Sequence, residues 1–234
     1  MTMKRILGTL AVFAFATLAE ATTYSYTGPV LSVLTNFPGP CGAPPCTNYT
    51  GTSHVTGSLT TAAPLAANLP AGTNISGLVT SFSFADGLNT YSSSDPNTRR
   101  FEVLAGTDGT GNIAGADILL EIWQSGTSPH SAADRFSLIE FGGGTQDRGV
   151  NNAPCSLVGA APASVDACIS ASADLSTSQE HAAAVGGGAW LVGAGPGPSV
   201  AAVGIPTLAE WALALLAVLV AAGAVLSLRG NRRA

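Results

Sequence analysis

The strongest constraint on this chain is the position of its charges relative to two uncharged apolar runs at its ends. Residues 6–18 and 211–228 contain no charged side chain, and each run adjoins basic residues. Only 10% of the 234 residues are charged, whereas a typical soluble protein has about 25%. An apolar run beside basic residues is typical of a membrane-targeting segment, so the two ends have to be interpreted before the body of the chain.

The first run predicts a secretory signal peptide over residues 1–21. Lys4 and Arg5 form a positive amino-terminal region, and the apolar run that follows has 13 residues. A helix that crosses a bilayer needs roughly 20. Ala19 and Ala21 are the small residues that signal peptidase requires, so cleavage is expected after Ala21. The alternative is an uncleaved membrane anchor.

The second run predicts one transmembrane helix over residues 211–228. Its length of 18 residues corresponds to about 27 Å of helix, at the low end of what a bilayer requires. The basic residues Arg229, Arg232 and Arg233 follow directly, and such a cluster is retained on the cytoplasmic side as a stop-transfer signal. The bulk of the chain is then expected outside the cytoplasm. A buried core helix is the alternative, but it would normally be apolar on one side only.

A short motif stands directly before the predicted helix. It has the form IPTL-x-x-W and consists of Ile205, Pro206, Thr207, Leu208 and Trp211. The motif, the helix and the basic cluster together resemble the IPTL-CTERM sorting domain of Gram-negative bacteria, a relative of the PEP-CTERM tails. The resemblance covers residues 205–234, with Ala212 where the family usually has Gly.

This resemblance implies sorting and processing at the inner membrane. An exosortase-type membrane transpeptidase would cut near the motif and pass the upstream part to the cell surface or to an exopolysaccharide matrix. Pro206 disfavours helix at Ile205, which is compatible with an extended and accessible cleavage segment. A permanent anchor with a chance match to the motif is the alternative.

The body of the chain, residues 22–181, predicts one exported β-rich domain. Short runs that alternate in polarity are separated by clusters of Gly, Asn, Asp and Pro, which is the pattern of strands and turns. The runs cover residues 24–27, 54–60, 78–84, 101–104, 118–123 and 135–141. Only residues 171–184 show weak helical spacing. We expect an antiparallel β-sandwich or β-roll.

Five stretches within residues 22–141, namely 26–28, 55–69, 81–87, 101–103 and 111–120, resemble the domain of many small exported proteins that carry PEP-CTERM tails. That family implies export and no established activity. The chain between the body and the motif, residues 182–204, is rich in Gly, Ala and Pro and has no charge, so it predicts a flexible linker. Trp190 and Leu191 are the exception, and docking onto the domain or the membrane interface is the alternative for them.

The four cysteines of an exported chain predict disulfide bonds. Cys41 and Cys46 are close in sequence, as are Cys155 and Cys168, so local pairing is expected, each bond closing a loop without secondary structure. Four cysteines allow two other pairings, which stay open. A zinc site is disfavoured because no C-x-x-C pair exists and the histidines are scattered. No metal and no cofactor is expected.

Candidate catalytic residues are few. Glu121 and Glu140 lie on neighbouring strand patterns and would be the carboxylate pair of a glycan hydrolase. A charge on a strand is more often a solvated face, and no nucleophile elbow or zinc-protease motif is present. His54, His130 and His181 lack a neighbourhood that fits a catalytic base. We expect no catalytic residue and no enzyme.

Two binding alternatives remain open. Asp108, Asn112 and Asp117 loosely match an oxygen-rich calcium loop, but the Gly-rich segment around Asp108 is more typical of a hairpin turn. Gly142–Gly144 follows a strand pattern and is interpreted as a turn. A glycan-binding sandwich would place exposed aromatic residues in a groove. The candidates for such a groove are Tyr91, Trp123 and Trp190.

The net charge limits the classes of partner that the chain is expected to bind. Nine basic residues against 14 acidic ones cannot neutralise a phosphate backbone, so a nucleic-acid partner is excluded. Residues 22–204 carry 12 acidic and 4 basic residues, a net charge of −8. Adhesion of this exported part to an anionic exopolysaccharide would have to rest on hydrogen bonds, stacking or bridging cations.

The signal-peptide interpretation predicts a mature chain that begins at Thr22. Amino-terminal sequencing or intact-mass measurement of exported material checks it. A mature chain that still begins at Met1 would contradict cleavage and favour the membrane-anchor alternative.

Overall fold

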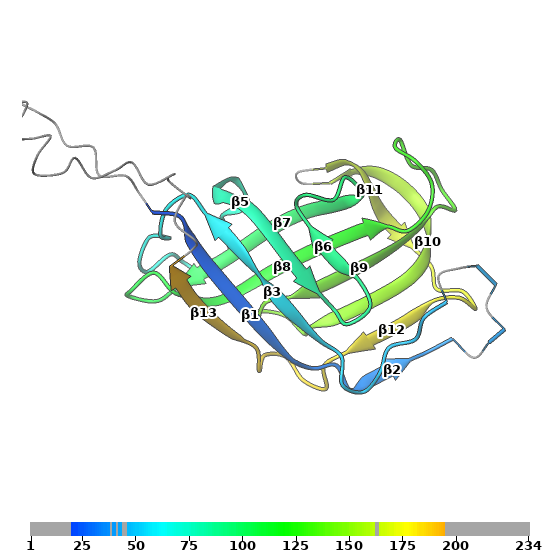
Figure 1. Cartoon of the computed structure of the whole chain (residues 1–234), viewed down its shortest axis with the longest axis horizontal. Helices are drawn as coiled ribbons and strands as arrows, with labels where there is room; N and C mark the ends of the chain where they lie inside the picture. The colour runs from blue at the N-terminus through cyan, green and yellow to red at the C-terminus, as the bar shows by residue number, and fades with distance from the viewer. Residues whose placement is uncertain (1–19, 38, 41, 44–45, 162–163, 195–234) are drawn as a thin grey trace, which may run out of the picture. The chain divides into compact units, whose positions relative to one another are not determined.

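The structure, a computed structural model, describes residues 20–37, 39–40, 42–43, 46–161 and 164–194. These residues form two antiparallel β-sheets that pack face to face (Figure 1). The first sheet has five strands in the order β13-β1-β3-β5-β6. Its strands are β1 (Thr22–Val30), β3 (His54–Thr61), β5 (Val79–Ala85), β6 (Thr90–Ser92) and β13 (Ala189–Ala194).

The second sheet has eight strands, of which seven follow the order β2-β12-β10-β9-β8-β7-β4 and the eighth, β11, pairs with β10. One 3-10 turn, η1 (Ser76–Leu78), precedes β5. The strands are β2 (Val33–Thr35), β4 (Thr73–Asn74), β7 (Thr98–Thr107), β8 (Ile113–Trp123), β9 (Arg135–Phe141), β10 (Arg148–Ala161), β11 (Ser164–Ala171) and β12 (Ser178–His181).

The expectation of a mainly β, antiparallel domain is confirmed, and the sandwich is the form it takes. Within the described residues, no helix has the length and apolar character needed to cross a membrane. The transmembrane helix expected at 211–228 lies outside the described residues, as does the signal peptide apart from Glu20 and Ala21. Strand β1 begins directly after the expected cleavage site, at Thr22.

The main core lies between the two sheets. Alternation on each strand directs one set of side chains inward, because successive residues of a strand point to opposite faces. The first sheet contributes Tyr24, Tyr26, Val55, Leu59 and Phe84, and the second contributes Val103, Ala105, Ile118, Leu120, Ile139 and Phe141. These side chains are at most 2% exposed, so the strand patterns predicted from alternation are confirmed where they matter for packing.

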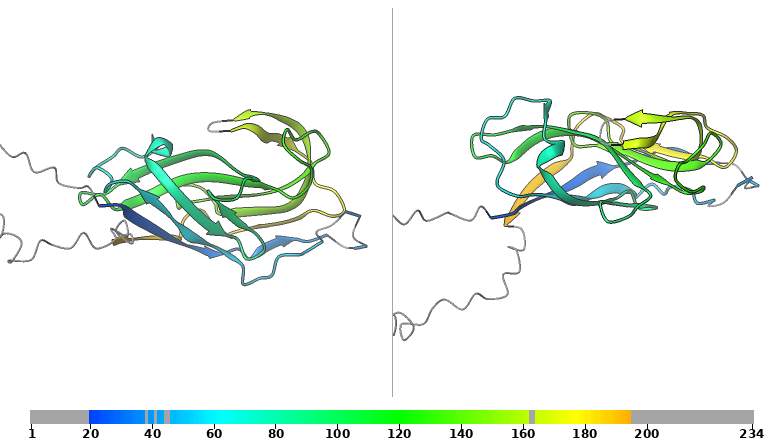
Figure 2. Two further views of the ribbon diagram at one scale, coloured as in Figure 1. Left: turned by 45° about the horizontal axis from the view of Figure 1, so that its top comes forward. Right: turned by 90° about the horizontal axis from the view of Figure 1, so that it is seen from above.

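Strand β9 is buried on both faces. Ile139 and Phe141 face the main core, whereas Phe136 belongs to a second hydrophobic cluster with Leu138 packed against it. The hairpin of β10 and β11 folds over this other face of the second sheet, as Figure 2 shows. The sandwich therefore has a third layer at one end.

The hairpin is closed by the disulfide between Cys155 and Cys168, whose Cα atoms are 5.7 Å apart. The predicted local pairing is confirmed for these two residues. The expectation of a loop without secondary structure is wrong, because residues 148–161 and 164–171 form β10 and β11. Cys41 lies outside the described residues, and so does its predicted bond to Cys46.

The expectation of a flexible linker from residue 182 is wrong for residues 189–194, which form β13. This strand pairs with β1 over six residues, from Thr22 opposite Ala194 to Thr27 opposite Ala189. The indole of Trp190 explains the pairing, because it packs on Tyr26 with ring centroids 4.8 Å apart and donates to the Gly142 carbonyl at 3.0 Å. Burial of this side chain outweighs the entropy of the glycine-rich segment. The rest of the predicted linker, 195–204, lies outside the described residues.

Another correction concerns the weak helical spacing at 171–184. Residues 178–181 of this segment form β12, which pairs with β10 on one side and β2 on the other. Pairing on both sides supplies the backbone hydrogen bonds that an isolated polar segment lacks, so the sheet overrides the local preference.

Replacing Trp190 by Ala is expected to lower the free energy of unfolding by about 2–3 kcal/mol, because a large half-buried ring is lost from the edge of the core. Leu191 on the same strand is 69% exposed, and Leu191→Ala, the matched control, should change stability by less than about 0.5 kcal/mol. Urea denaturation of both variants checks this. Equal effects would show that β13 is not packed as described.

Candidate functional site

The two glutamates of the hydrolase hypothesis lie on the same face of the second sheet. Leu119 of β8 is opposite Glu140 of β9, and Glu121 is opposite Leu138, so the two acids are diagonal neighbours. Their surroundings differ. Glu140 accepts a hydrogen bond from Arg148 Nε, whereas Glu121 is fully buried and its Oε1 accepts the Cys168 N–H at 2.9 Å.

Glu121 borders a cavity beneath the hairpin, which we name the hairpin cavity. It has a volume of about 420 Å³ and lies between the outer face of β8 and β9 and the strands β10 and β11. Its lining is mostly apolar, with Glu121 and Arg148 as its ionisable side chains. Burial raises the pKa of Glu121 to about 7, although the Cys168 N–H and the nearby Arg99 act against that rise.

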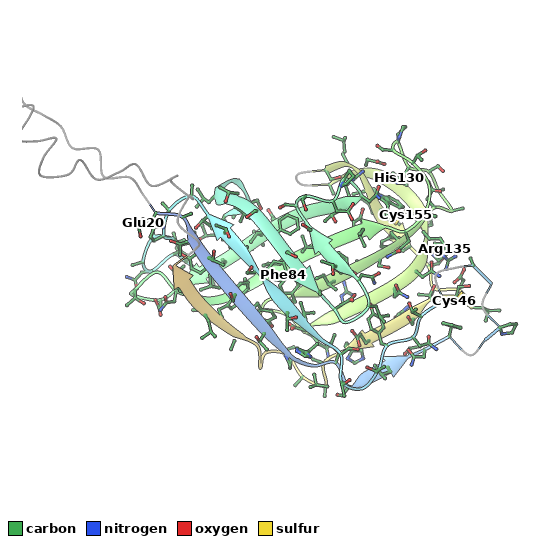
Figure 3. The ribbon with its side chains drawn as sticks, viewed as in Figure 1. Glu20, Cys46, Phe84, His130, Arg135 and Cys155 are labelled. Atoms are coloured by element: carbon green, nitrogen blue, oxygen red, sulfur yellow. A yellow bond between two sulfur atoms is a disulfide. The ribbon has the colours of Figure 1, made fainter. Side chains whose placement is uncertain are left out.

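Asp166 of β11 gathers donors from separate segments of the chain. Its carboxylate accepts Ser128 Oγ, the His130 N–H and His130 Nδ1, each at 2.8 Å, and Arg99 Nη2 at 3.0 Å. These hydrogen bonds hold the pKa of Asp166 well below its usual range. The backbone carbonyl of Asp166 also accepts Trp123 Nε1 at 3.0 Å. The cluster joins the hairpin and the loop that carries His130, labelled in Figure 3, to the second sheet.

His130 is a structural histidine in this arrangement. Its ring is stacked on Trp123, with centroids 4.3 Å apart and planes 6° from parallel. A glycan-binding sandwich would need its three candidate aromatic residues exposed in a groove, and this expectation is wrong. Tyr91 and Trp123 are buried, and Trp190 is half-buried against the core.

A second acidic cluster is enclosed at one end of the sandwich. Asp86 Oδ2 accepts the hydroxyls of Tyr49 at 2.9 Å and Tyr91 at 3.0 Å, while its Oδ1 accepts the N–H groups of Leu88 and Asn89. Glu180 of β12 is 1% exposed. Burial, reinforced by the negative charge of Asp86, raises the pKa of Glu180 to about 9, so Glu180 is protonated at neutral pH.

Burial of acids is a general feature of the domain. Those buried are Asp86, Glu121, Asp147, Asp166 and Glu180. Sequence reasoning singled out only Glu121 among them, and it placed that residue on a solvated face. Many of their partners come from distant parts of the chain, such as Tyr49 for Asp86 and His130 for Asp166, and no local spacing signals these contacts.

Arg135 is also buried, near the start of β9 (Figure 3). Its guanidinium binds both carboxylate oxygens of Asp174 at 2.9 Å and donates from Nε to Asn152 Oδ1 at 2.6 Å. Asn152 has a positive φ of 58°, and the register of β10 against β9 shifts between Val150 and Ala153. This arginine therefore stabilises the irregular part of β10, after which pairing with β9 resumes at Ala153.

The proposed calcium loop is the hairpin turn between β7 and β8. Asp108 Oδ1 accepts the N–H groups of Thr110 and Asn112 at 2.8 and 3.0 Å, and Oδ2 accepts Asn112 Nδ2 at 3.1 Å. These bonds lower the pKa of Asp108 to about 2. Gly142 and Gly143 follow β9 with positive φ angles, which confirms the predicted turn.

The remaining histidines are in local contacts, His54 with the Thr52 carbonyl and His181 with Gln146. Within the described residues, no group of three His, Cys, Asp or Glu side chains could hold a metal ion.

The chain carries an IPTL-CTERM motif at residues 204–233, which matches the tail identified from its residues. It is therefore a chain with a C-terminal sorting signal of exported proteins, and the motif implies processing by an exosortase-like enzyme. No curated protein and no solved structure matches the chain. The motif, its basic cluster and the proposed helix lie outside the described residues.

The raised pKa of Glu180 predicts a pH-dependent effect of Glu180→Gln. The unfolded chain releases this proton near pH 4.5, whereas the folded chain retains it up to about pH 9. Ionisation therefore favours unfolding increasingly between these values. The glutamine variant should be more stable by about 4 kcal/mol at pH 7.5 and by less than about 1 kcal/mol at pH 5, as urea denaturation at each pH would show.

Glu102→Gln is the matched control, since that glutamate bonds Asn74 at the protein surface. Its substitution should change stability by less than about 0.5 kcal/mol at pH 7.5. A Glu180→Gln variant whose effect is the same at pH 5 and pH 7.5 would contradict a proton held on Glu180.

Proposed function

We propose that this chain is an exported protein of a Gram-negative bacterium that is delivered to the cell surface or to an exopolysaccharide matrix. The observation that carries the proposal is the sorting motif at the extreme carboxyl end of the chain. The predicted signal peptide at the other end supports it, because the two signals together direct the β-sandwich across the inner membrane.

The tail acts in steps. The helix over residues 211–228 halts in the inner membrane, with Arg229, Arg232 and Arg233 on the cytoplasmic side. The exosortase-type transpeptidase then recognises the segment from Ile205 to Trp211 and separates the upstream domain from the helix. Strand β13 ends at Ala194, so ten residues separate the last strand from the motif.

The role proposed for the delivered domain is structural or interactive, and not enzymatic. Two observations support this. The two glutamates of the hydrolase hypothesis are engaged by different partners, Cys168 N–H for Glu121 and Arg148 for Glu140. His130 is packed between Trp123 and Asp166, with its side chain fully buried. A glycan-binding module is the second candidate, and it would have to use surfaces other than the three aromatic residues considered for it.

Substitution of the motif tests the sorting step. Pro206→Ala combined with Thr207→Ala should leave the chain as a membrane-bound precursor of unchanged mass, because the transpeptidase no longer recognises the segment. The measurement is the mass and the membrane-to-surface distribution of the chain in the native host.

Ala209→Ser is the matched control, since position 209 is one of the variable positions of IPTL-x-x-W. This variant should be processed as the unaltered chain is. Normal processing of the motif variant, or normal release in a host that lacks the exosortase-like enzyme, would favour a permanent anchor instead.

A further inference from the structure

Glu121 lines the hairpin cavity and has a buried carboxylate oxygen that the described residues leave unpaired. Glu121 is 0% exposed, and its Oε1 accepts the Cys168 N–H. Its Oε2 has no hydrogen-bond partner among the described residues. Leaving a buried polar atom unpaired costs about 1–3 kcal/mol, and more when the group is charged. The carboxylate of Glu121 therefore lacks a hydrogen-bond donor, which a molecule from outside the chain would supply.

The walls of the cavity indicate what kind of molecule would carry such a donor. Leu119, Phe136 and Leu138 form the side that belongs to the second sheet, and Ile169 and Ala161 contribute from the hairpin. Apolar walls with one well-placed polar group are typical of small-molecule sites, and about 420 Å³ is within their usual range of volumes. The occupant should have an apolar body and a single donor head.

We propose that the hairpin cavity binds a small amine with an apolar body, whose ammonium group donates a hydrogen bond to Glu121 Oε2. A charge-assisted hydrogen bond of this kind is roughly twice as strong as a neutral one, so an ammonium is preferred to a hydroxyl. An organic anion is disfavoured, because its charge would meet the carboxylate. The net charge of −8 on residues 22–204 attracts a cation from a distance.

The charged groups around Glu121 come from several elements. Arg99 of β7 favours the ionised form of Glu121, and Asp166 of β11 opposes it. Arg148 of β10 lines the cavity as well, and Glu140 of β9 compensates its charge through their ion pair. The cavity thus presents one uncompensated acceptor at Glu121. This proposal is independent of the sorting tail.

The test is a titration of the full-length chain with 4-fluorophenethylamine, followed by ¹⁹F NMR. 2-(4-Fluorophenyl)ethanol and 4-fluorophenylacetate serve as probes with the same ring and a different head. The amine should bind at least about tenfold more tightly than the alcohol, and the acetate should not bind. Equal affinity of the amine and the alcohol, or no binding of the amine, would overturn the proposal.

Two variants locate the site. Glu121→Gln should weaken binding of the amine at least about tenfold, and Ile169→Ala, on the opposite wall, should weaken it several-fold. Glu102→Gln is the matched control, because Glu102 bonds Asn74 at the protein surface and is not part of the cavity lining, and it should change the affinity less than about twofold. Retention of full affinity in Glu121→Gln or in Ile169→Ala would overturn the site.

The unaltered protein provides a readout that needs no variant. The pKa of Glu121 is raised to about 7 by burial, so its ionised fraction increases between about pH 6 and pH 8, whereas a primary amine stays charged over this range. The affinity for 4-fluorophenethylamine should rise across that interval. An affinity that is flat or falls with pH would contradict a contact to this carboxylate, even if Glu121→Gln failed to fold.

Discussion

The contact of Tyr26 with three other segments is the interaction on which the sandwich most depends. The ring of Tyr26 packs between Phe141 of β9 and Trp190 of β13, with centroids 5.3 and 4.8 Å away. Its hydroxyl donates to Asp147 at 2.8 Å. One side chain thus joins the two sheets and closes the edge of the first. The other donor to Asp147 is the Gly142 N–H at 3.3 Å, so without Tyr26 this buried acid would keep one long hydrogen bond, and leaving a buried carboxylate poorly paired in an apolar interior is costly.

The positions of the acids in the fold change the interpretation of the low charge content of the chain. Five carboxylic acids are inside the domain, and each is engaged in its own way: Asp86 by tyrosine hydroxyls, Asp166 by His130 and Arg99, Glu180 by protonation. Burying these groups is costly unless specific partners meet them. The clusters therefore join distant segments, including the hairpin that forms the third layer, in a definite arrangement. Glu121 and Glu180 both keep carboxylate oxygens without a hydrogen-bond partner among the described residues, and Glu121 also lines a cavity.

Much of the strand framework could be predicted from the sequence, because alternation of polarity is a local signal. This alternation was sufficient to predict the strands β1, β3, β8 and β9. It could not show which face of β9 was the core, since Phe136 and Leu138 pack under a hairpin formed by later residues. Strand β13 was missed because its flanking glycines indicate flexibility, whereas its stability comes from Trp190 and the open edge of β1.

The candidate sites also differ in whether the sequence alone could predict them. The sorting motif is contiguous and could be recognised from its order and position alone. The local disulfide could be expected from spacing, although its hairpin could not. The acid clusters include pairs that are far apart in sequence, such as His130 with Asp166 at 36 positions and Tyr26 with Asp147 at 121, and such contacts are properties of the fold.

The central claim is that the folded domain extends through β13, so that only ten residues lie between a strand of the first sheet and the sorting motif. Hydrogen–deuterium exchange of the full-length chain tests it most directly, by comparing amides of residues 189–194 with those of β3. The account predicts that the β13 amides that pair with β1 are protected well above the level of an unstructured peptide, and that β3, which is paired on both sides, is protected more uniformly. Exchange of residues 189–194 at the rate of an unstructured peptide would contradict it.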